Sequence, residues 1–291
     1  MLKGSLVALV TPMSNGGCID YSNLEKLIDF HVEQGSHGLV IAGTTGESAT
    51  LDFDEHCELL NRAREIINRR VPMIAGTGAN STSEAILLTR CAKKAQADAA
   101  LLVTPYYNKP TQEGLYQHHK AIAEAVEIDQ ILYNVPGRTA CDMQPDTVQR
   151  LALVKNIIGI KEATGDLERL RQIQQRVSKD FLLLSGDDAT TRQFILQGGH
   201  GSISVTANVA PAQMAQMCLA ALAGNAEEAL RIDQQIAELH RVLFIESNPI
   251  PVKWAVSQMG LCENIFRLPL TPLSEKYHAT LRNALVAAGV L

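Results

Sequence analysis

The sequence has little of what marks proteins that bind nucleic acids or membrane surfaces. Only 4% of its 291 residues are aromatic and 20% are charged, and the 26 basic and 31 acidic side chains give a formal charge of −5. Neither sign of charge forms a block along the chain. Nucleic acids and anionic membranes are bound by concentrated Lys and Arg, so the sequence predicts neither as a partner.

Long hydrophobic runs are also missing. Residues 193–226 contain no Asp, Glu, Lys or Arg, but glycine, asparagine and proline interrupt them, and their longest apolar run is Met217–Ala223. A membrane-spanning helix needs roughly 20 mostly apolar residues. The N-terminal run Leu6–Val10 is likewise shorter than the core of a signal peptide, which has ~7–15 residues. We therefore expect no membrane association and a cytoplasmic location.

Motifs for metals, redox pairs and nucleotides are absent as well. The six cysteines are widely spaced without a CxxC, which predicts scattered free thiols in a reducing compartment. His118 and His119 are adjacent and cannot share one helix face, as a metal-binding pair at i and i+4 does. Gly76-Thr77-Gly78 lacks the third glycine of a dinucleotide-binding loop, and the acidic residues within 52–58 are typical of the first turn of a helix. We expect no metal and no organic cofactor.

What the sequence does have is a repeated alternation of short apolar runs with amphipathic segments. We expect strands over residues 5–10, 38–42, 72–75, 99–103, 130–133, 157–161, 181–185 and 201–205, and helices over 22–34, 54–68, 81–97, 111–126 and 166–177. The helix at 81–97 opens with Ser81 and Glu84 at the spacing of a capping box. The apolar runs are continuous rather than alternating, which is typical of strands covered on both faces.

The number and order of these units favour one α/β architecture. Eight strand-then-helix units fit a closed (β/α)8 TIM barrel better than an open doubly wound sheet. The units end near Gly224, and the remaining residues are helical in pattern over 226–244, 249–258 and 274–288. The sequence thus predicts a catalytic barrel at 1–224 and a C-terminal helical extension at 225–291.

The candidate catalytic residues lie where the expected strands end, because a TIM barrel carries its active site there. Lys161 ends an apolar strand and is either a solvated side chain or an amine nucleophile that forms a Schiff base. An exposed lysine is almost entirely protonated at pH 7, and burial favours the neutral amine that can attack a carbonyl. Tyr133 ends the fifth strand and Tyr106-Tyr107 follow the fourth, so phenols are available as a proton shuttle.

Two further strand ends carry groups suited to carboxylates. Thr44 and Thr45 lie in a glycine-flanked turn, which either presents backbone N–H groups to a carboxylate or is an ordinary turn with a hydroxyl cap. Arg138 follows Pro136-Gly137 and is either a fixed guanidinium for a second carboxylate or a surface arginine. The residues alone leave these alternatives open.

Taken together, these strand ends resemble one enzyme family. Three motifs are similar to those of the dihydrodipicolinate (4-hydroxy-tetrahydrodipicolinate) synthase family: Gly43–Ser48, Tyr133–Thr139 and Gly159–Ala163. Supporting matches lie at residues 185–188, 201–205 and 248–253, and the resemblance runs from Gly4 to the C-terminus. It implies a lyase of lysine and diaminopimelate biosynthesis, in which Lys161 forms a Schiff base with pyruvate. The resulting enamine adds to L-aspartate 4-semialdehyde, and ring closure releases the product and the lysine.

The resemblance also implies roles for individual residues and a form of assembly. The proton relay corresponds to Thr44, Tyr133 and Tyr107, with Tyr107 contributed by the neighbouring subunit. Arg138 corresponds to the residue that takes the carboxylate of the semialdehyde. The carboxylate of pyruvate is held by residues matching Thr45, Gly186 and Ile203. No metal or organic cofactor is implied, and the assembly expected is a homotetramer built from two tight dimers.

A regulatory pocket between paired subunits is the last implication of the resemblance. Many bacterial members are inhibited there by L-lysine. Feedback-sensitive members often have histidine where this chain has Phe53, so we expect weaker or intermediate inhibition. The positions that match the pocket are Ser48, Ala49, His56, Asn80, Glu84 and Tyr106.

Two alternatives remain open on the sequence. Another pyruvate Schiff-base aldolase, such as N-acetylneuraminate lyase or a keto-deoxy-sugar-acid aldolase, would share the equivalents of Lys161 and Tyr133. Gly137-Arg138 favours the synthase, because a sugar-handling site more often has small or hydroxyl side chains at that step. A non-catalytic ligand-binding protein on the same barrel usually loses its nucleophile or its shuttle, and this chain has both.

Overall fold

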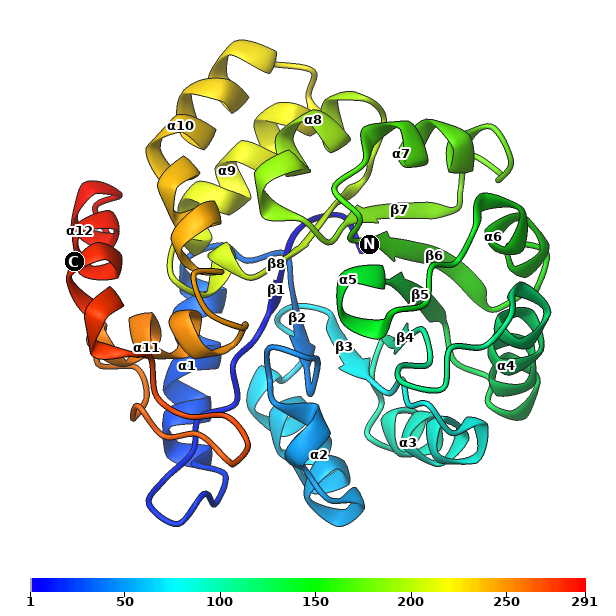
Figure 1. Cartoon of the computed structure of the whole chain (residues 1–291), viewed down its shortest axis with the longest axis horizontal. Helices are drawn as coiled ribbons and strands as arrows, with labels where there is room; N and C mark the ends of the chain where they lie inside the picture. Colours follow the sequence, from blue (N-terminus) through cyan, green and yellow to red (C-terminus); the bar gives the residue numbers. More distant parts are fainter. Residues whose placement is uncertain (1) are drawn as a thin grey trace.

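A closed barrel of eight parallel strands forms the centre of the molecule, as Figure 1 shows for this computed structural model, which describes residues 2–291. The strands follow one another around the barrel in chain order, and the first pairs with the last. The predicted (β/α)8 TIM barrel is therefore confirmed. The strands are β1 (Gly4–Ala8), β2 (Gly38–Ile41), β3 (Met73–Gly76), β4 (Ala99–Val103), β5 (Gln130–Asn134), β6 (Ile157–Glu162), β7 (Leu182–Ser185) and β8 (Gly201–Ser204).

Helices surround the barrel, and three more follow it at the C-terminus. In Figure 1, α10 (Ala226–Val242), α11 (Ile250–Gln258) and α12 (His278–Ala287) lie on the side where α1 and α9 cover β1 and β8. The expected C-terminal helices are confirmed to within a few residues. The remaining helices are α1 (Tyr21–Glu33), α2 (Phe53–Ile67), α3 (Thr82–Lys94), α4 (Gln112–Ala125), α5 (Pro136–Thr139), α6 (Pro145–Leu151), α7 (Leu167–Gln174), α8 (Thr191–Leu196) and α9 (Pro211–Leu222).

The strands are buried on both faces, which explains their continuous apolar sequences. In β1, Leu6 and Ala8 point into the barrel interior, whereas Val7 packs against the surrounding helices. Alternate residues of a strand point to opposite faces. The register of β5 on β6 pairs Tyr133 with Lys161, so the two residues predicted to carry the chemistry share the interior face.

The predicted capping box at Ser81 does not form. Ser81 is the N-cap of α3, but its side chain makes no capping hydrogen bond; its hydroxyl instead lies 3.0 Å from that of Ser83. A capping box forms at the start of α2, where Asp52 and Glu55 bond reciprocally to each other's backbone N–H.

The expectation that all six cysteines are free thiols is also wrong. Cys57 on α2 and Cys91 on α3 form a disulfide, with their Cα atoms 5.6 Å apart. The packing of neighbouring helices brings together residues that are 34 positions apart in the chain. The other four cysteines are free. From residue 2 to residue 291, none of the helices combines the length and the apolar character that crossing a membrane requires.

Candidate active site

A cavity of about 160 Å³ opens at the carboxyl ends of the strands. Its lining brings together seven of the eight residues for which catalytic or substrate-binding roles were expected, from five different strand ends. The exception is Tyr107, whose side chain is 89% exposed and lies outside this lining. The seven are Thr44, Thr45, Tyr133, Arg138, Lys161, Gly186 and Ile203.

Lys161 and Tyr133 form the centre of the site. They are 6% and 7% exposed, and Lys161 Nζ lies 4.1 Å from the centroid of the Tyr133 ring. Among residues 2–291, no carboxylate forms an ion pair with this amine. Lys161 Nζ thus lies against the face of the Tyr133 ring and lines the cavity, the placement expected of an amine that attacks a carbonyl substrate.

Gly186, which follows β7, leaves the space that the Lys161 side chain occupies. A Cβ at this position would lie 2.9 Å from Cε and 3.1 Å from Cγ of Lys161, and 2.6 Å from Cβ of Ala163. Any larger residue would therefore push the lysine out of its present position. Sequence reasoning singled out Gly186 for its match to a binding motif and missed this steric role.

The turn after β2 is anchored by a buried ion pair that sequence reasoning also missed. Glu47 has a left-handed backbone, with φ of 58°, and its Oε1 lies 2.5 Å from Nζ of Lys253 in α11. Both side chains are 0% exposed. Burial lowers the pKa of Lys253 although Glu47 acts in the opposite direction. The pair ties the C-terminal extension to the turn that carries Thr44 and Thr45.

Asn248, just before α11, makes a second link to the same turn. Its Nδ2 donates to Oγ1 of Thr45 at 3.0 Å, and its carbonyl oxygen accepts from Nη2 of Arg138 at 3.0 Å. One residue of the extension thus holds two side chains for which carboxylate contacts were expected. The only sequence signal was that Asn248 and Lys253 belong to one of the matching motifs.

A second cavity of about 530 Å³ lies beside the first, between α2, α3 and the turns after β2 and β4. It contains five of the six residues expected to form a lysine pocket: Ser48, Ala49, His56, Glu84 and Tyr106. The sixth, Asn80, is not part of its lining, but its amide donates to the carbonyl of Tyr106 at 3.2 Å. Thr44 and Arg138 line both cavities, so the two are neighbours in direct contact.

The polar groups of this second cavity have defined surroundings. His56 Nε2 lies 2.8 Å from the carbonyl of Gly76, and burial lowers the pKa of His56. Burial and the nearby Glu84 carboxylate raise the pKa of Tyr106. Phe53 also lines the cavity and is 47% exposed. In the part of the chain that the structure describes, no three or more His, Cys, Asp or Glu side chains are grouped to hold a metal ion.

Comparison with known proteins points to one family over the whole chain. The model of the Dihydrodipicolinate synthetase family matches residues 1–288. The chain is 62% identical over 291 residues to the 4-hydroxy-tetrahydrodipicolinate synthase of Stutzerimonas stutzeri (strain A1501), with 100% of both chains covered.

Two solved structures with bound ligands are similar to this chain. The chloride-inhibited dihydrodipicolinate synthase from Acinetobacter baumannii, complexed with pyruvate, has 54% sequence identity and a TM-score of 0.99 over 100% of both chains. The DHDPS from Cyanidioschyzon merolae, with lysine bound, has 40% identity and a TM-score of 0.96 over 99% of each chain.

Proposed function

Because the chain belongs to the dihydrodipicolinate synthetase family, we propose that its barrel mouth condenses pyruvate with L-aspartate 4-semialdehyde through a Schiff base on Lys161. The enzyme is a lyase, a 4-hydroxy-tetrahydrodipicolinate synthase of lysine and diaminopimelate biosynthesis. The observation that carries the assignment of the nucleophile is the buried Lys161 amine, which lies 4.1 Å from the Tyr133 ring centroid and has no carboxylate partner among the described residues.

The first half of the reaction uses Lys161 and Tyr133. The neutral amine attacks C2 of pyruvate, and the carbinolamine loses water to give the imine. A proton then leaves C3, and the enamine forms. The Tyr133 hydroxyl serves this step as proton donor and acceptor, and Thr44 continues the relay towards the cavity mouth. The turn at Thr45, with Gly186 and Ile203 opposite, holds the pyruvate carboxylate.

The second half forms the ring. C3 of the enamine attacks the aldehyde carbon of the semialdehyde, and the aldehyde oxygen takes up a proton. The amino group of the semialdehyde then attacks C2, the bond to Lys161 breaks, and the lysine returns as a free amine; the net change is loss of one water. Arg138, at the cavity mouth and fixed by Asn248, binds the carboxylate of the semialdehyde.

A turnover assay with competing aldehydes tests this assignment. With pyruvate as donor, we expect the purified enzyme to consume L-aspartate 4-semialdehyde, and to consume N-acetylmannosamine or other sugar aldehydes far more slowly. The Arg138→Ala variant should lose most activity with the semialdehyde, because the carboxylate of the semialdehyde loses its charged partner. Turnover of a sugar aldehyde at a comparable or higher rate would overturn the choice of second substrate.

We also propose that the site is completed by a second copy of the chain. Tyr107 has a left-handed backbone, with φ of 73°, is 89% exposed and does not line the active-site cavity of its own chain. Phe53, Leu87 and Tyr106, which line the second cavity, are also exposed hydrophobic residues. Such a patch is typical of a protein interface. A partner covering it would receive Tyr107 into its own proton relay, within a homotetramer of two tight dimers.

Mixing two inactive variants tests whether Tyr107 crosses between subunits. In a mixed dimer, the Tyr107→Phe chain keeps its native Lys161 and the Lys161→Ala chain keeps its native Tyr107. These two native residues meet in one site only if Tyr107 acts in the site of the partner chain. We expect co-refolded or co-expressed mixtures to recover activity well above that of either variant alone. Activity that stays at the sum of the two parents would contradict the proposal.

The second cavity is proposed as the site of a free L-lysine effector. Glu84 supplies a carboxylate for an ammonium group, and His56 and Tyr106 are polar partners at the same cavity. Phe53 places an apolar ring among them, so we expect weak or intermediate inhibition and a stronger effect in the Phe53→His variant. The absence of inhibition at millimolar L-lysine would remove the regulatory proposal and leave the catalytic one unaffected.

Two other sequence predictions stay proposals. A cytoplasmic location is tested by cell fractionation. The division into a catalytic barrel at 1–224 and a helical extension at 225–291 is tested by truncation after residue 224. Because the extension supplies Lys253 and Asn248 to the turn after β2, we expect the truncated chain to lose activity.

A further inference from the structure

Directly next to the catalytic pair, β5 and β6 carry a second facing pair. The register that places Tyr133 opposite Lys161 also places Asn134 opposite Glu162. Asn134 is 0% and Glu162 3% exposed. Because side chains alternate along a strand, these two point out of the barrel towards the helices. Nδ2 of Asn134 donates to Oε2 of Glu162 at 3.1 Å and lies 3.4 Å from Oε1.

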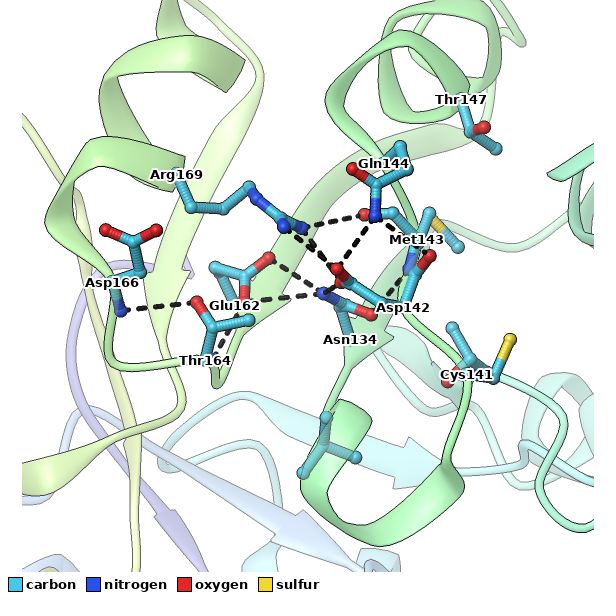
Figure 2. A network of polar contacts seen from close by, with 12 residues as sticks. Asn134, Cys141, Asp142, Met143, Gln144, Thr147, Glu162, Thr164, Asp166 and Arg169 are labelled. Carbon is cyan, nitrogen blue, oxygen red and sulfur yellow. Dashed lines mark hydrogen bonds and ion pairs between the residues drawn. The ribbon is translucent and has the colours of Figure 1, made fainter. Parts of the chain in front are cut away.

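This pair is the centre of a network that joins four segments of the chain (Figure 2). Asn134 Nδ2 also donates to Oδ1 of Asp142 at 2.9 Å, and its Oδ1 accepts from the backbone N–H of Met143 at 2.9 Å. Arg169, in α7, donates to both carboxylate oxygens of Asp142 at 2.8 and 2.9 Å. The backbone N–H of Thr164 donates to Glu162 Oε1 at 2.8 Å.

The chemistry of these groups allows only one arrangement. The amide nitrogen of Asn134 faces two carboxylates, which accept hydrogen bonds, and its oxygen faces a backbone N–H, which donates one. Although burial acts in the opposite direction, hydrogen bonds from Arg169 and Asn134 lower the pKa of Asp142. Burial raises the pKa of Glu162. A fully bonded polar network in a buried place fixes its members more tightly than apolar packing does.

We propose that Asn134 and Glu162 are positioning residues that set the distance between Tyr133 and Lys161. Each is the next residue along its strand from a member of that pair, so a shift of β5 along β6 would break their hydrogen bond and displace the catalytic groups together. The strand pair is irregular at its other end, where the register shifts between Gln130 and Ile131. At the catalytic end the network adds side-chain hydrogen bonds to the backbone ladder, in which the Ala163 N–H donates to the Asn134 carbonyl at 2.9 Å. The inference rests on the proposed roles of Lys161 and Tyr133.

The Glu162→Gln variant of the full-length enzyme tests this role. Glutamine has nearly the same shape but only one acceptor oxygen, so its NH2 group must face either the NH2 group of Asn134 or the backbone N–H of Thr164, two donors in contact. We expect one of these hydrogen bonds to be lost and the strand ends to shift. Because a misplacement of about 1 Å in a reacting group costs on the order of 100-fold in rate, the rate constant of imine formation at saturating pyruvate should fall by roughly 10- to 100-fold.

The assay must separate positioning from stability. Borohydride trapping with pyruvate, run to completion, counts the sites that are able to react. The initial rate of trapping, divided by that count, is the rate constant per competent site. A merely structural network would lower the melting temperature and the number of competent sites but leave the rate constant per site unchanged. The matched control is Asp146→Asn, which breaks the ion pair between Asp146 in α6 and Arg176, just after α7, without touching the network.

Each outcome decides the proposal. A fall in the per-site rate constant in Glu162→Gln, with Asp146→Asn unchanged, supports it. If Glu162→Gln does not fold, Arg169→Lys keeps the charge, loses the two-oxygen contact with Asp142, and should show the same defect in a milder form. A per-site rate within about twofold of the native enzyme in the variant that folds would overturn it. If the native enzyme itself forms no adduct on Lys161, the proposed function has failed, which is a different result.

Discussion

Replacing Lys253 with methionine tests how the C-terminal extension supports the substrate-binding turn. Lys253 and Glu47 are both 0% exposed and lie 2.5 Å apart. Removing one partner leaves the other charge buried without compensation, which costs about 3–5 kcal/mol. Methionine is a linear apolar side chain of similar length, so the loss should come mainly from the unpaired Glu47 carboxylate and not from a large cavity.

A double variant separates the charge from the packing. In Glu47→Gln/Lys253→Met both charges disappear together, and replacing a whole buried pair by uncharged groups is often neutral or stabilising. We therefore expect the double variant to recover most of the stability that Lys253→Met loses. Its pyruvate KM should also recover, because Glu47 closes the turn that presents Thr44 and Thr45 to the cavity.

The free energy of unfolding is measured by urea titration at one protein concentration, because association of subunits adds to the apparent stability. Glu168→Gln serves as the control, since it removes an ion pair with Arg171 in which both side chains are 58% exposed. Such exposed pairs contribute about 0–1 kcal/mol. A loss of under about 1 kcal/mol in Lys253→Met, equal to that of the control, would refute the claim that the buried pair anchors the turn.

Three further changes test the site and the helix layer. Gly186→Ala places a methyl group 2.9 Å from Cε of Lys161 and 2.6 Å from Cβ of Ala163, and we expect steady-state assays to show kcat about 100-fold lower together with a lower melting temperature from overpacking. Tyr133→Phe removes only the hydroxyl, so pyruvate adduct formation should persist while kcat falls by about 10²- to 10⁴-fold; full activity would contradict the proton-shuttle role. Burial lowers the pKa of His118 to about 4 and that of His119 well below its usual value. Because an unfolded histidine titrates near 6.5, the unfolded state takes up more protons below that pH, and stability should decline as the pH falls from about 6.5. Urea titrations between about pH 7.5 and 5 should show a shallower decline for His119→Phe than for the native chain.

The barrel could be predicted from the sequence because its strands are buried on both faces. Such strands appear as short unbroken apolar runs, and the β4 run, Ala99–Val103, coincides with the predicted one. The short helices α6 and α8 were not predicted, since seven and six residues are too few to show a helical periodicity. The Ser81 capping box failed because its hydroxyl bonds to Ser83 instead, a choice that residue spacing does not determine.

The predictable part of the site consists of residues at strand ends. A TIM barrel brings its strand ends to one rim, so the positions of Lys161, Tyr133 and Arg138 in the sequence are enough to group them. The contacts that link the C-terminal extension to the turn after β2 could not be predicted in this way. Lys253 and Glu47 are 206 residues apart in the chain and Asn248 is 203 residues from Thr45, and contacts over such separations depend on how the C-terminal helices pack on the barrel.

The central claim is that Lys161 is the nucleophile, and the most direct test is to incubate the enzyme with saturating pyruvate, reduce it with borohydride and map the peptides by mass spectrometry. We predict a single pyruvate-sized adduct on Lys161, abolished in Lys161→Ala and still on Lys161 when the buried Lys253 is replaced. An adduct on another lysine, or none on well-folded enzyme, would contradict the account.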